Sequence, residues 1–272
     1  MQQREVFLIL IDISGYTRFT RLHRLSAMHA EKIITDLLES IISRASLPLV
    51  VHELQGDSVN FYALADAGRQ TALEVRRQVG TIFEAFRLRE GELISDCGLC
   101  VCQACQNVGK LRLKAVLHHG EAIFNTIAGF RKVSGEDVIL AHRLMKNSVA
   151  ESEYVIETEE FYRLAGAVTG TRQEQMTEDY EGVGKVTVRV FYPGESLAPA
   201  KGARRSLLSK LRMSWRNDAY ALRRLFQRAP RPFQNLGATP AALSQTALFA
   251  TRTHLTVNTA AAKSDKTQHI PR

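Results

Sequence analysis

Two aspartates, each close to a glycine, are the residues of this chain whose setting best suits chemistry. Asp12 ends the apolar run FLILID and is followed by Ser14 and Gly15, whereas Asp57 stands in the tight turn QGD between two short apolar segments. If the strands that carry them are neighbours in one sheet, both carboxylates emerge at the same edge. Converging carboxylates form a site for a hard cation such as Mg²⁺ or Mn²⁺, and nearby glycines let a large anionic ligand approach the backbone. For either residue alone, a role in capping a turn is an equally open interpretation.

The second group with chemical potential is a cluster of cysteines. All four cysteines of the chain fall within nine residues, CGLCVCQAC, which form the pairs Cys97-x-x-Cys100 and Cys102-x-x-Cys105. A disulfide framework would spread them through the fold, so the clustering points to metal or redox chemistry. Both pairs could close on one Zn²⁺, an iron–sulfur cluster needs the same number of ligands, and a redox-sensing dithiol is the remaining alternative.

The elements that must position these residues follow from hydrophobic spacing and turn signals. EVFLILID reads as a buried strand, and the turn at Gly56-Asp57 joins two further strands in a hairpin. Helical spacing is found in three long segments and one short one, at residues 26–46, 66–90, 135–148 and 159–164. Further strands are expected as a pair around Gly120 (111–120 and 121–129), at 154–158 and near 186–192. This order predicts an antiparallel or mixed sheet with helices on one face. His118 and His119 should then point to opposite faces of their strand, one of them packed or hydrogen-bonded in the sheet.

Charge divides the chain into two parts. The whole chain of 272 residues has a net charge of +8, but residues 1–199 contain 22 basic and 26 acidic residues, and residues 200–272 contain 14 and 2. The tail includes a candidate basic amphipathic helix near 204–228 and is otherwise expected to be largely disordered. Such a helix could lie on an anionic membrane surface, bind an acidic partner or dock on its own domain, and no motif for sequence-specific nucleic-acid binding accompanies it. The chain contains no run of 18 apolar residues and no secretory signal, so a cytoplasmic location is expected.

Four segments together resemble the motifs of the class III adenylyl/guanylyl (nucleotidyl) cyclase catalytic domain. They are DISGYTRFT, ELQGDSVNFYA, LKAVLHHGEA and VSGEDVILAHRLMKNS. The 45 residues between Asp12 and Asp57 are close to the spacing in that family, and the cysteine cluster is similar to an uncharacterised bacterial branch of it. The resemblance covers residues 5 to about 192 and implies an α+β fold with a ferredoxin-like βαββαβ core, its helices packed on a mostly antiparallel sheet. The domain would occupy residues 1–199, with the cysteine cluster as an insert at 95–108.

The resemblance also implies roles for particular residues. Asp12 and Asp57, with the carbonyl of Ile13, would hold two Mg²⁺ ions, one activating the ribose 3′-hydroxyl and one gripping the triphosphate. Arg143 would neutralise charge in the transition state. Active sites of the family lie in a head-to-tail homodimer, with the aspartates from one chain and the arginine from the other. The phosphate oxygens would be cradled by the backbone of Ser14, Gly15, Tyr16 and Thr17.

Three positions depart from the family's pattern. The base-reading positions hold Glu53, as in guanylyl cyclases, and Lys132, which fits neither base, while the ribose-binding asparagine is replaced by Ile139. The sequence therefore predicts a cyclase-like protein that binds a divalent cation and a nucleoside triphosphate, with a 3′,5′-cyclic nucleotide as the product that the fold suggests. The alternatives are a catalytically degenerate signalling or binding module, and a metal-stabilised adaptor whose function lies in the basic tail.

Overall fold

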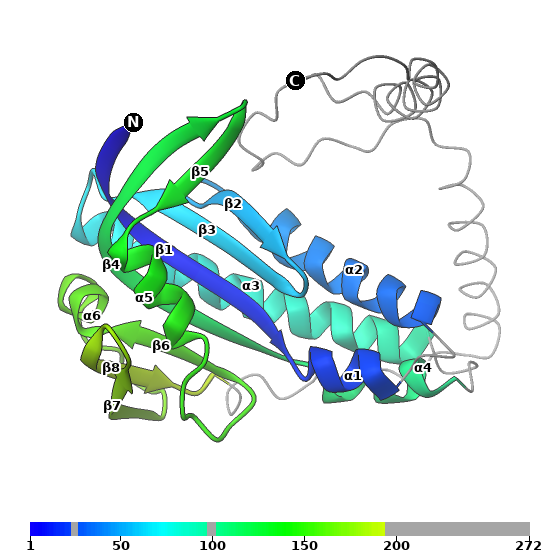
Figure 1. The fold of residues 1–272 in the computed structure, drawn as a ribbon. Coiled ribbons are helices and arrows are strands. Elements are labelled where there is room, and N and C mark those ends of the chain that lie inside the picture. The colour runs from blue at the N-terminus through cyan, green and yellow to red at the C-terminus, as the bar shows by residue number, and fades with distance from the viewer. Residues whose placement is uncertain (23–26, 97–101, 194–272) are drawn as a thin grey trace, which may run out of the picture. The chain divides into compact units, whose positions relative to one another are not determined.

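A computed structural model describes residues 1–22, 27–96 and 102–193 of the chain. These residues form an eight-stranded mixed sheet (Figure 1). Seven of its strands follow the order β2-β3-β1-β4-β6-β8-β7, and the eighth, β5, pairs with β4 outside this order. All pairings are antiparallel except that of β4 with β6. The strands are β1 (Gln2–Ser14), β2 (Val50–Gln55), β3 (Ser58–Leu64), β4 (Arg112–Ile127), β5 (Phe130–Ser134), β6 (Tyr154–Thr158), β7 (Gln173–Tyr180) and β8 (Gly184–Phe191). The helices are α1 (Tyr16–Leu22), α2 (Ala27–Arg44), α3 (Arg69–Asp96), α4 (Gln103–Asn107), α5 (Glu136–Leu144) and α6 (Glu159–Ala165), with a 3₁₀ turn η3 (Val108–Lys110).

Strand β1 lies between β3 and β4 in the interior of the sheet, and its residues from Val6 to Ile11 are buried. Phe7, Ile9 and Ile11 belong to the hydrophobic core beneath α2 and α3, whereas Leu8 and Leu10 belong to a second core on the face that carries α5. Because successive side chains of a strand point to opposite faces, covering both faces requires an unbroken apolar run. This is the physical reason for the sequence FLILI before Asp12.

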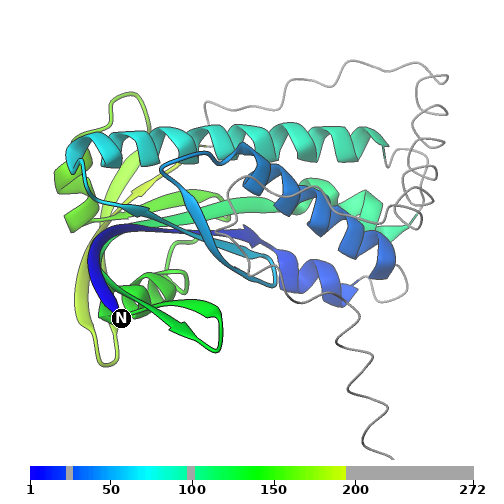
Figure 2. The same ribbon diagram turned by 90° about the horizontal axis from the view of Figure 1, so that it is seen from above.

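The helices cover both faces of the sheet, not one as the element order suggested. Helices α2 and α3 lie along one face, and α5 lies with the β4–β5 hairpin on the opposite face (Figure 2). The expected helix at 135–148 is therefore present but packs on the other side of the sheet. Between the two helical layers, the middle residues of β1 and β4 belong to hydrophobic clusters on both faces of the sheet.

Strand β4 is a single long strand and not the pair of strands expected around Gly120. It runs without interruption past Gly120, which is opposite Val6 in β1. A Cβ atom built on Gly120 would lie 2.3 Å from Cγ and Oδ2 of Asp137 in α5. The glycine thus serves the close approach of a helix rather than a turn, and a sequence pattern cannot separate these two uses.

His118 and Asp137 complete this attachment of α5 to the sheet. His118 is 2 % exposed, its Nδ1 lies 2.9 Å from Oγ1 of Thr158, and its Nε2 lies 3.1 Å from Oδ1 of Asp137. The other carboxylate oxygen of Asp137 accepts a hydrogen bond of 2.6 Å from the backbone N–H of Glu121. The hydrogen bond from His118 is the main cause that lowers the pKa of Asp137. As predicted, His119 points to the opposite face, where its ring packs 4.9 Å from that of Phe7.

The remaining differences from the predicted elements concern short or polar segments. Helices α1 and α4 and strands β5 and β7 were not predicted, because each is too short or too polar to show a clear hydrophobic period. The hairpin at Gly56-Asp57 is confirmed, with Gln55 paired to Ser58 and Gly56 at a φ of +63°. The tail at 200–272, including the candidate helix near 204–228, lies outside the described residues. Within the described part of the chain, no helix has the length and apolar character needed to cross a membrane.

Candidate functional site

The first aspartate lies near the end of β1 on the face of the sheet that carries α5. Asp12 is opposite Ser58 in β3 and Lys114 in β4. Since Leu8 and Leu10 belong to the α5-side core, the alternation of β1 places Asp12 on that face too. The ammonium group of Lys114 lies 3.1 Å from Oδ2 of Asp12 and also donates to the carbonyl of Met145, at 3.3 Å. Both charged side chains are about four-fifths buried, with exposures of 20 % for Asp12 and 21 % for Lys114.

The second aspartate is brought to the same place by the β2–β3 turn. Asp57 directly precedes Ser58, the partner of Asp12, and its backbone carbonyl accepts a hydrogen bond of 3.3 Å from the N–H of Ile13. Pairing of β1 with β3 thus sets the two carboxylates side by side, as the sequence predicted on the condition that these strands are neighbours. Asp12 and Asp57 are 45 positions apart in the sequence, and the antiparallel register of β1 with β3 brings them together.

Burial and this proximity change the electrostatics of the pair. Burial is the first cause that raises the pKa of Asp57 to about 7, and the negative charge of Asp12 together with a hydrogen bond to it are further causes. Lys114 acts in the opposite direction but does not cancel the effect. Two carboxylates that face a single ammonium group leave an excess of negative charge, which a bound cation would neutralise.

The turn between β1 and α1 adjoins the aspartates. Gly15 has a φ of +90° and its carbonyl accepts from Phe19 N–H, which starts α1 directly behind the turn. A Cβ on Gly15 would lie 3.5 Å from the carbonyl of Lys110, so η3 packs against the back of this turn. Tyr16 lies within the field of Asp57: burial, Glu31 and Asp57 raise the pKa of its phenol. Ser14 and Thr17 lie on either side of Gly15 and Tyr16, so all four predicted phosphate-binding residues lie at this junction.

The two predicted base-reading residues lie on different strands. Glu53 is an exposed residue of β2, opposite Asn60 and next to a β-bulge at His52. Lys132 is an exposed residue of β5, opposite Asn125 in the long hairpin that β4 and β5 form. Burial is the main cause that lowers the pKa of His52, and the charge of His142 in α5 also lowers it.

Helix α5 carries the predicted catalytic arginine and the departure from the family's asparagine. The guanidinium of Arg143 donates a hydrogen bond to the carbonyl of Glu181 in the turn between β7 and β8. Ile139, one turn earlier, is 54 % exposed despite its apolar side chain. In this chain Arg143 is therefore held towards the β7–β8 turn, while Ile139 faces outwards from α5.

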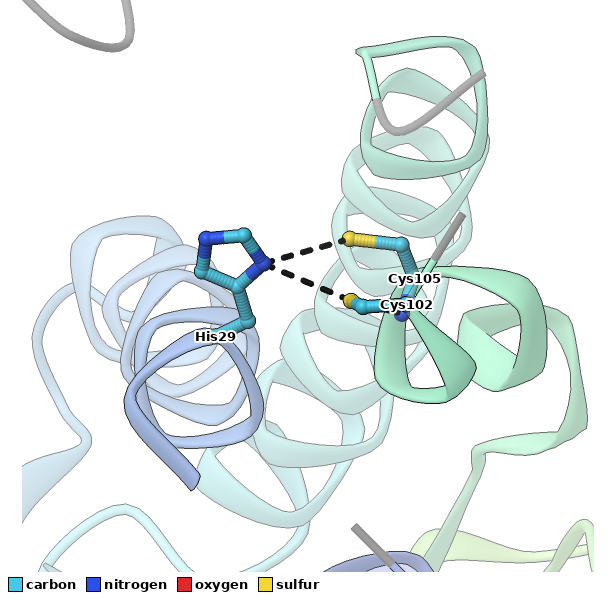
Figure 3. Close-up of side chains that lie close together, drawn as sticks. All are labelled: His29, Cys102 and Cys105. Atoms are coloured by element: carbon cyan, nitrogen blue, oxygen red, sulfur yellow. Dashed lines mark hydrogen bonds between the residues drawn. The ribbon is translucent and has the colours of Figure 1, made fainter. Parts of the chain in front are cut away.

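The structure describes half of the cysteine cluster and adds a histidine to it. Cys102 and Cys105 lie at the start and in the middle of α4, and both face His29 from α2 (Figure 3). One ligand atom of each of these three residues lies within 4.8 Å of the others. Cys97 and Cys100 lie outside the described residues.

Two residues of these sites were missed by sequence reasoning. The position of Lys114 could have been found, because it precedes the buried Val116 by two residues in a strand and so shares its face. His29 carries no local signal: it is one histidine in a helix, and 73 residues separate it from Cys102. Only the packing of α4 against α2 brings the two together.

The described domain has the fold of class III nucleotidyl cyclase catalytic domains. It is similar to the crystal structure of the adenylyl cyclase CyaB from P. aeruginosa, with a TM-score of 0.58, 15% sequence identity and coverage of 70% of this chain and 94% of that chain. Similarity extends to the guanylyl cyclase Cya2, with a TM-score of 0.56, 15% identity and coverage of 76% and 98%. The guanylate cyclase domain of RhGC from Catenaria anguillulae, solved in complex with GTP, gives a TM-score of 0.51 at 13% identity, covering 70% and 98%. The predicted fold class is thereby confirmed.

Sequence comparison points to an uncharacterised bacterial branch with this fold. Residues 34–154 match a family described as "Protein of unknown function (DUF2652)". The chain is also 28% identical over 208 residues to "Uncharacterized protein Rv2561/Rv2562" of Mycobacterium tuberculosis, which covers 75% of this chain and 95% of that relative. These relatives agree with the uncharacterised bacterial branch that the sequence suggested. The fold of this chain is shown by its similarity to the cyclase structures.

Proposed function

We propose that this domain binds a divalent cation together with a nucleoside triphosphate at the Asp12–Asp57 pair. The observation that carries the proposal is the convergence of the two carboxylates, which the pairing of β1 with β3 places side by side; burial, and after it the charge of Asp12, raise the pKa of Asp57 to about 7. Mg²⁺ or Mn²⁺ would take oxygen ligands from both aspartates and from the carbonyl of Ile13, and would offset the excess negative charge that Lys114 leaves. The triphosphate would then bind the cation and the backbone of Ser14–Thr17.

The proposed chemistry is attack of the ribose 3′-hydroxyl on the α-phosphorus, which releases pyrophosphate and forms a 3′,5′-cyclic nucleotide. The 3′-hydroxyl would lose its proton to solvent, the 3′-oxygen would form a bond to the α-phosphorus, and the bond from that phosphorus to the bridging oxygen would break, so that pyrophosphate leaves with this oxygen. The metal would lower the pKa of the hydroxyl and stabilise the leaving group. Arg143 of the partner subunit would neutralise the transition state in a head-to-tail homodimer.

A second candidate, a binding module without catalysis, is favoured by the residues of α5 and β5. Ile139 cannot donate a hydrogen bond to a ribose, and Lys132 does not match the acceptor that adenine recognition needs. The metal half of the site would remain, and nucleotide binding would itself be the signal. The two candidates share the same cation site and differ only in whether product forms.

The deciding experiment is incubation of the full chain with Mn²⁺ and ATP or GTP, with cyclic nucleotide measured by mass spectrometry and nucleotide binding by calorimetry. Asp57→Ala should lower metal-dependent nucleotide affinity by at least about tenfold. Asp66→Ala is the matched control, because Asp66 is an aspartate with a 70 % exposed side chain that pairs with Arg4 at the far end of β1 and β3.

Three results separate the candidates. Product that disappears in Asp57→Ala but not in Asp66→Ala establishes a cyclase. Metal-dependent binding without product, lost only in Asp57→Ala, establishes a binding module. Binding that is absent, or unchanged by Asp57→Ala, overturns the proposal.

A further inference from the structure

The start of α4 is folded so that two thiols point the same way. Cys102 is the N-cap residue of α4, with φ −69° and ψ 146°, and its Sγ accepts a hydrogen bond of 3.4 Å from the N–H of Cys105. This is the local geometry of a C-x-x-C turn, in which the second cysteine lies one helical turn after the first. Both cysteines are half-buried and pack against the core beneath α2 and α3.

A histidine from a distant helix completes the group. His29, near the N-terminal end of α2, directs its Nδ1 towards both sulfurs (Figure 3). The Nδ1 atom lies 3.4 Å from Sγ of Cys102 and 3.9 Å from Sγ of Cys105. His29 is exposed at the surface, so its imidazole is not placed there by burial in a core.

These distances match the edges of a coordination tetrahedron. With Zn–S of about 2.3 Å and Zn–N of about 2.05 Å, tetrahedral angles place the nitrogen about 3.6 Å from each sulfur. The two observed separations lie on either side of this value. A neutral imidazole nitrogen holds one proton or one lone pair and so makes one good hydrogen bond, whereas a shared ion draws it towards both sulfurs at once.

We propose that His29, Cys102 and Cys105 form three corners of a zinc site that fastens α4 to α2. Two thiolates and an imidazole form a soft donor set, which selects Zn²⁺ over the hard cations expected at the aspartates. The site is distinct from the aspartate pair and does not depend on nucleotide binding. It differs from the four-cysteine site predicted from the sequence, because one ligand comes from α2.

The site has a consequence for the turn after β1. Helix α4 continues into η3, and the carbonyl of Lys110 at the end of η3 packs behind Gly15. An ion that fixes α4 would therefore also fix the segment that supports the β1–α1 turn. Loss of zinc should loosen this turn without altering the positions of Asp12 and Asp57, which the strand register sets.

Metal content of the purified full chain is the direct test. After reduction and incubation with Zn²⁺ alone, followed by removal of unbound metal, we expect one zinc per chain by elemental analysis. Co²⁺ in place of zinc should give the visible bands of a tetrahedral ion and a thiolate charge-transfer band. His29→Ala, Cys102→Ser and Cys105→Ser should each weaken zinc binding by at least about tenfold.

Two controls make the test decisive. Gln106→Ala removes an exposed side chain from α4 without touching the proposed ligands and should retain zinc. The double variant Cys97→Ser/Cys100→Ser separates this site from one that is built on the four cysteines alone. Circular dichroism of each variant establishes that it is folded; His29 is exposed, so its substitution should leave the fold intact.

The opposite results would overturn the proposal. A wild-type chain that binds no zinc after reduction has no such site. Zinc that persists in folded His29→Ala, but is lost in Cys97→Ser/Cys100→Ser, would assign the metal to the cysteines alone. The absorption of an iron–sulfur cluster in the purified protein would contradict zinc as the resident metal.

Discussion

Asp57 shows at the scale of one residue how the fold changes ordinary chemistry. An aspartate in an exposed hairpin turn would be ionised at neutral pH, but burial and Asp12 raise its pKa to about 7. The folded protein therefore binds a proton on Asp57 that the unfolded chain has released above its ordinary pKa of 3.8. By linkage, the contribution of this group to the free energy of unfolding is present at low pH and is lost as the pH rises towards 7.

The first prediction concerns this pH dependence. Between pH 4 and pH 7, Asp57→Asn should remove the part of the stability loss that comes from ionising Asp57, because an amide does not titrate there. Chemical denaturation of the wild type and of Asp57→Asn at a series of pH values measures the difference. Asp66→Asn, at an exposed aspartate, serves as the control. Identical pH profiles of Asp57→Asn and the wild type would show that the carboxylates do not interact.

The same group predicts how metal binding should depend on pH. A cation requires the ionised carboxylate, so Mn²⁺ should stabilise the wild type more at pH 8 than at pH 5.5. Thermal unfolding with and without Mn²⁺ measures this, and Asp57→Asn should abolish most of the stabilisation at pH 8. A stabilisation that does not change with pH would place the cation elsewhere.

At the scale of elements, the attachment of α5 to β4 depends on a glycine, a histidine and an aspartate. Gly120 leaves the space that the carboxylate of Asp137 occupies, and His118 holds that carboxylate from the other side. The His-x-Gly pattern that resembles the cyclase motif is thus explained by helix packing. The position of Arg143 and Ile139 depends on this attachment, because both lie on α5.

The third prediction tests the close approach at Gly120. Gly120→Ala should destabilise the domain by about 1–3 kcal/mol, because its Cβ would lie 2.3 Å from Asp137 and the helix must move. Gly80→Ala is the matched control: Gly80 lies in α3 with open space around its Cβ position, and alanine there should stabilise the helix by about 1 kcal/mol. Urea denaturation measures both. Equal effects of the two substitutions would contradict this account of Gly120.

Buried charge makes another element-scale connection, between α3 and the β6–α6 segment. Glu157 is 1 % exposed, and Arg76 of α3 donates two hydrogen bonds to its carboxylate, of 2.7 Å and 2.6 Å. Arg76 also donates to the carbonyls of Ala165 and Gly166 at the end of α6. One guanidinium therefore joins three elements, which keeps the helical layer in register with the sheet.

At the scale of the molecule, the β4–β5 hairpin and α5 leave apolar side chains uncovered. Phe130 and Ile127 are 67 % and 54 % exposed at the hairpin tip, and Ile139 is 54 % exposed on α5. All lie on elements of the α5 side of the sheet, away from α2 and α3 (Figure 2). The proposed head-to-tail homodimer would cover these side chains, and removing their apolar surface from water would favour association.

The fourth prediction follows from this surface. Phe130→Asp should shift the full chain from dimer towards monomer, because a charge would have to be buried in the interface. Light scattering after size-exclusion chromatography measures the molar mass. Leu88→Asp is the control, since Leu88 is 68 % exposed and lies on α3, which covers the face of the sheet opposite to α5. A monomeric wild type, or equal effects of both substitutions, would contradict the proposed dimer.

The sequence by itself determined the parts of this protein that depend on local patterns. The apolar run before Asp12 predicted a buried strand, the Gly56-Asp57 turn predicted a hairpin, and helical spacing located α2, α3 and α5. These signals are strong because each reflects a period or a turn geometry that few residue types satisfy. The fold class followed from them and from the resemblance.

Tertiary structure alone decided which distant residues meet. Strand pairing set Asp57 beside Asp12 and placed Lys114 against it, α5 packed on the face that the element order left open, and Gly120 proved to be a packing position instead of a turn. His29 met Cys102 and Cys105 only because α4 lies on α2. Contacts of this kind depend on register and helix packing, which are set by the burial of whole surfaces, and no short stretch of sequence contains that information.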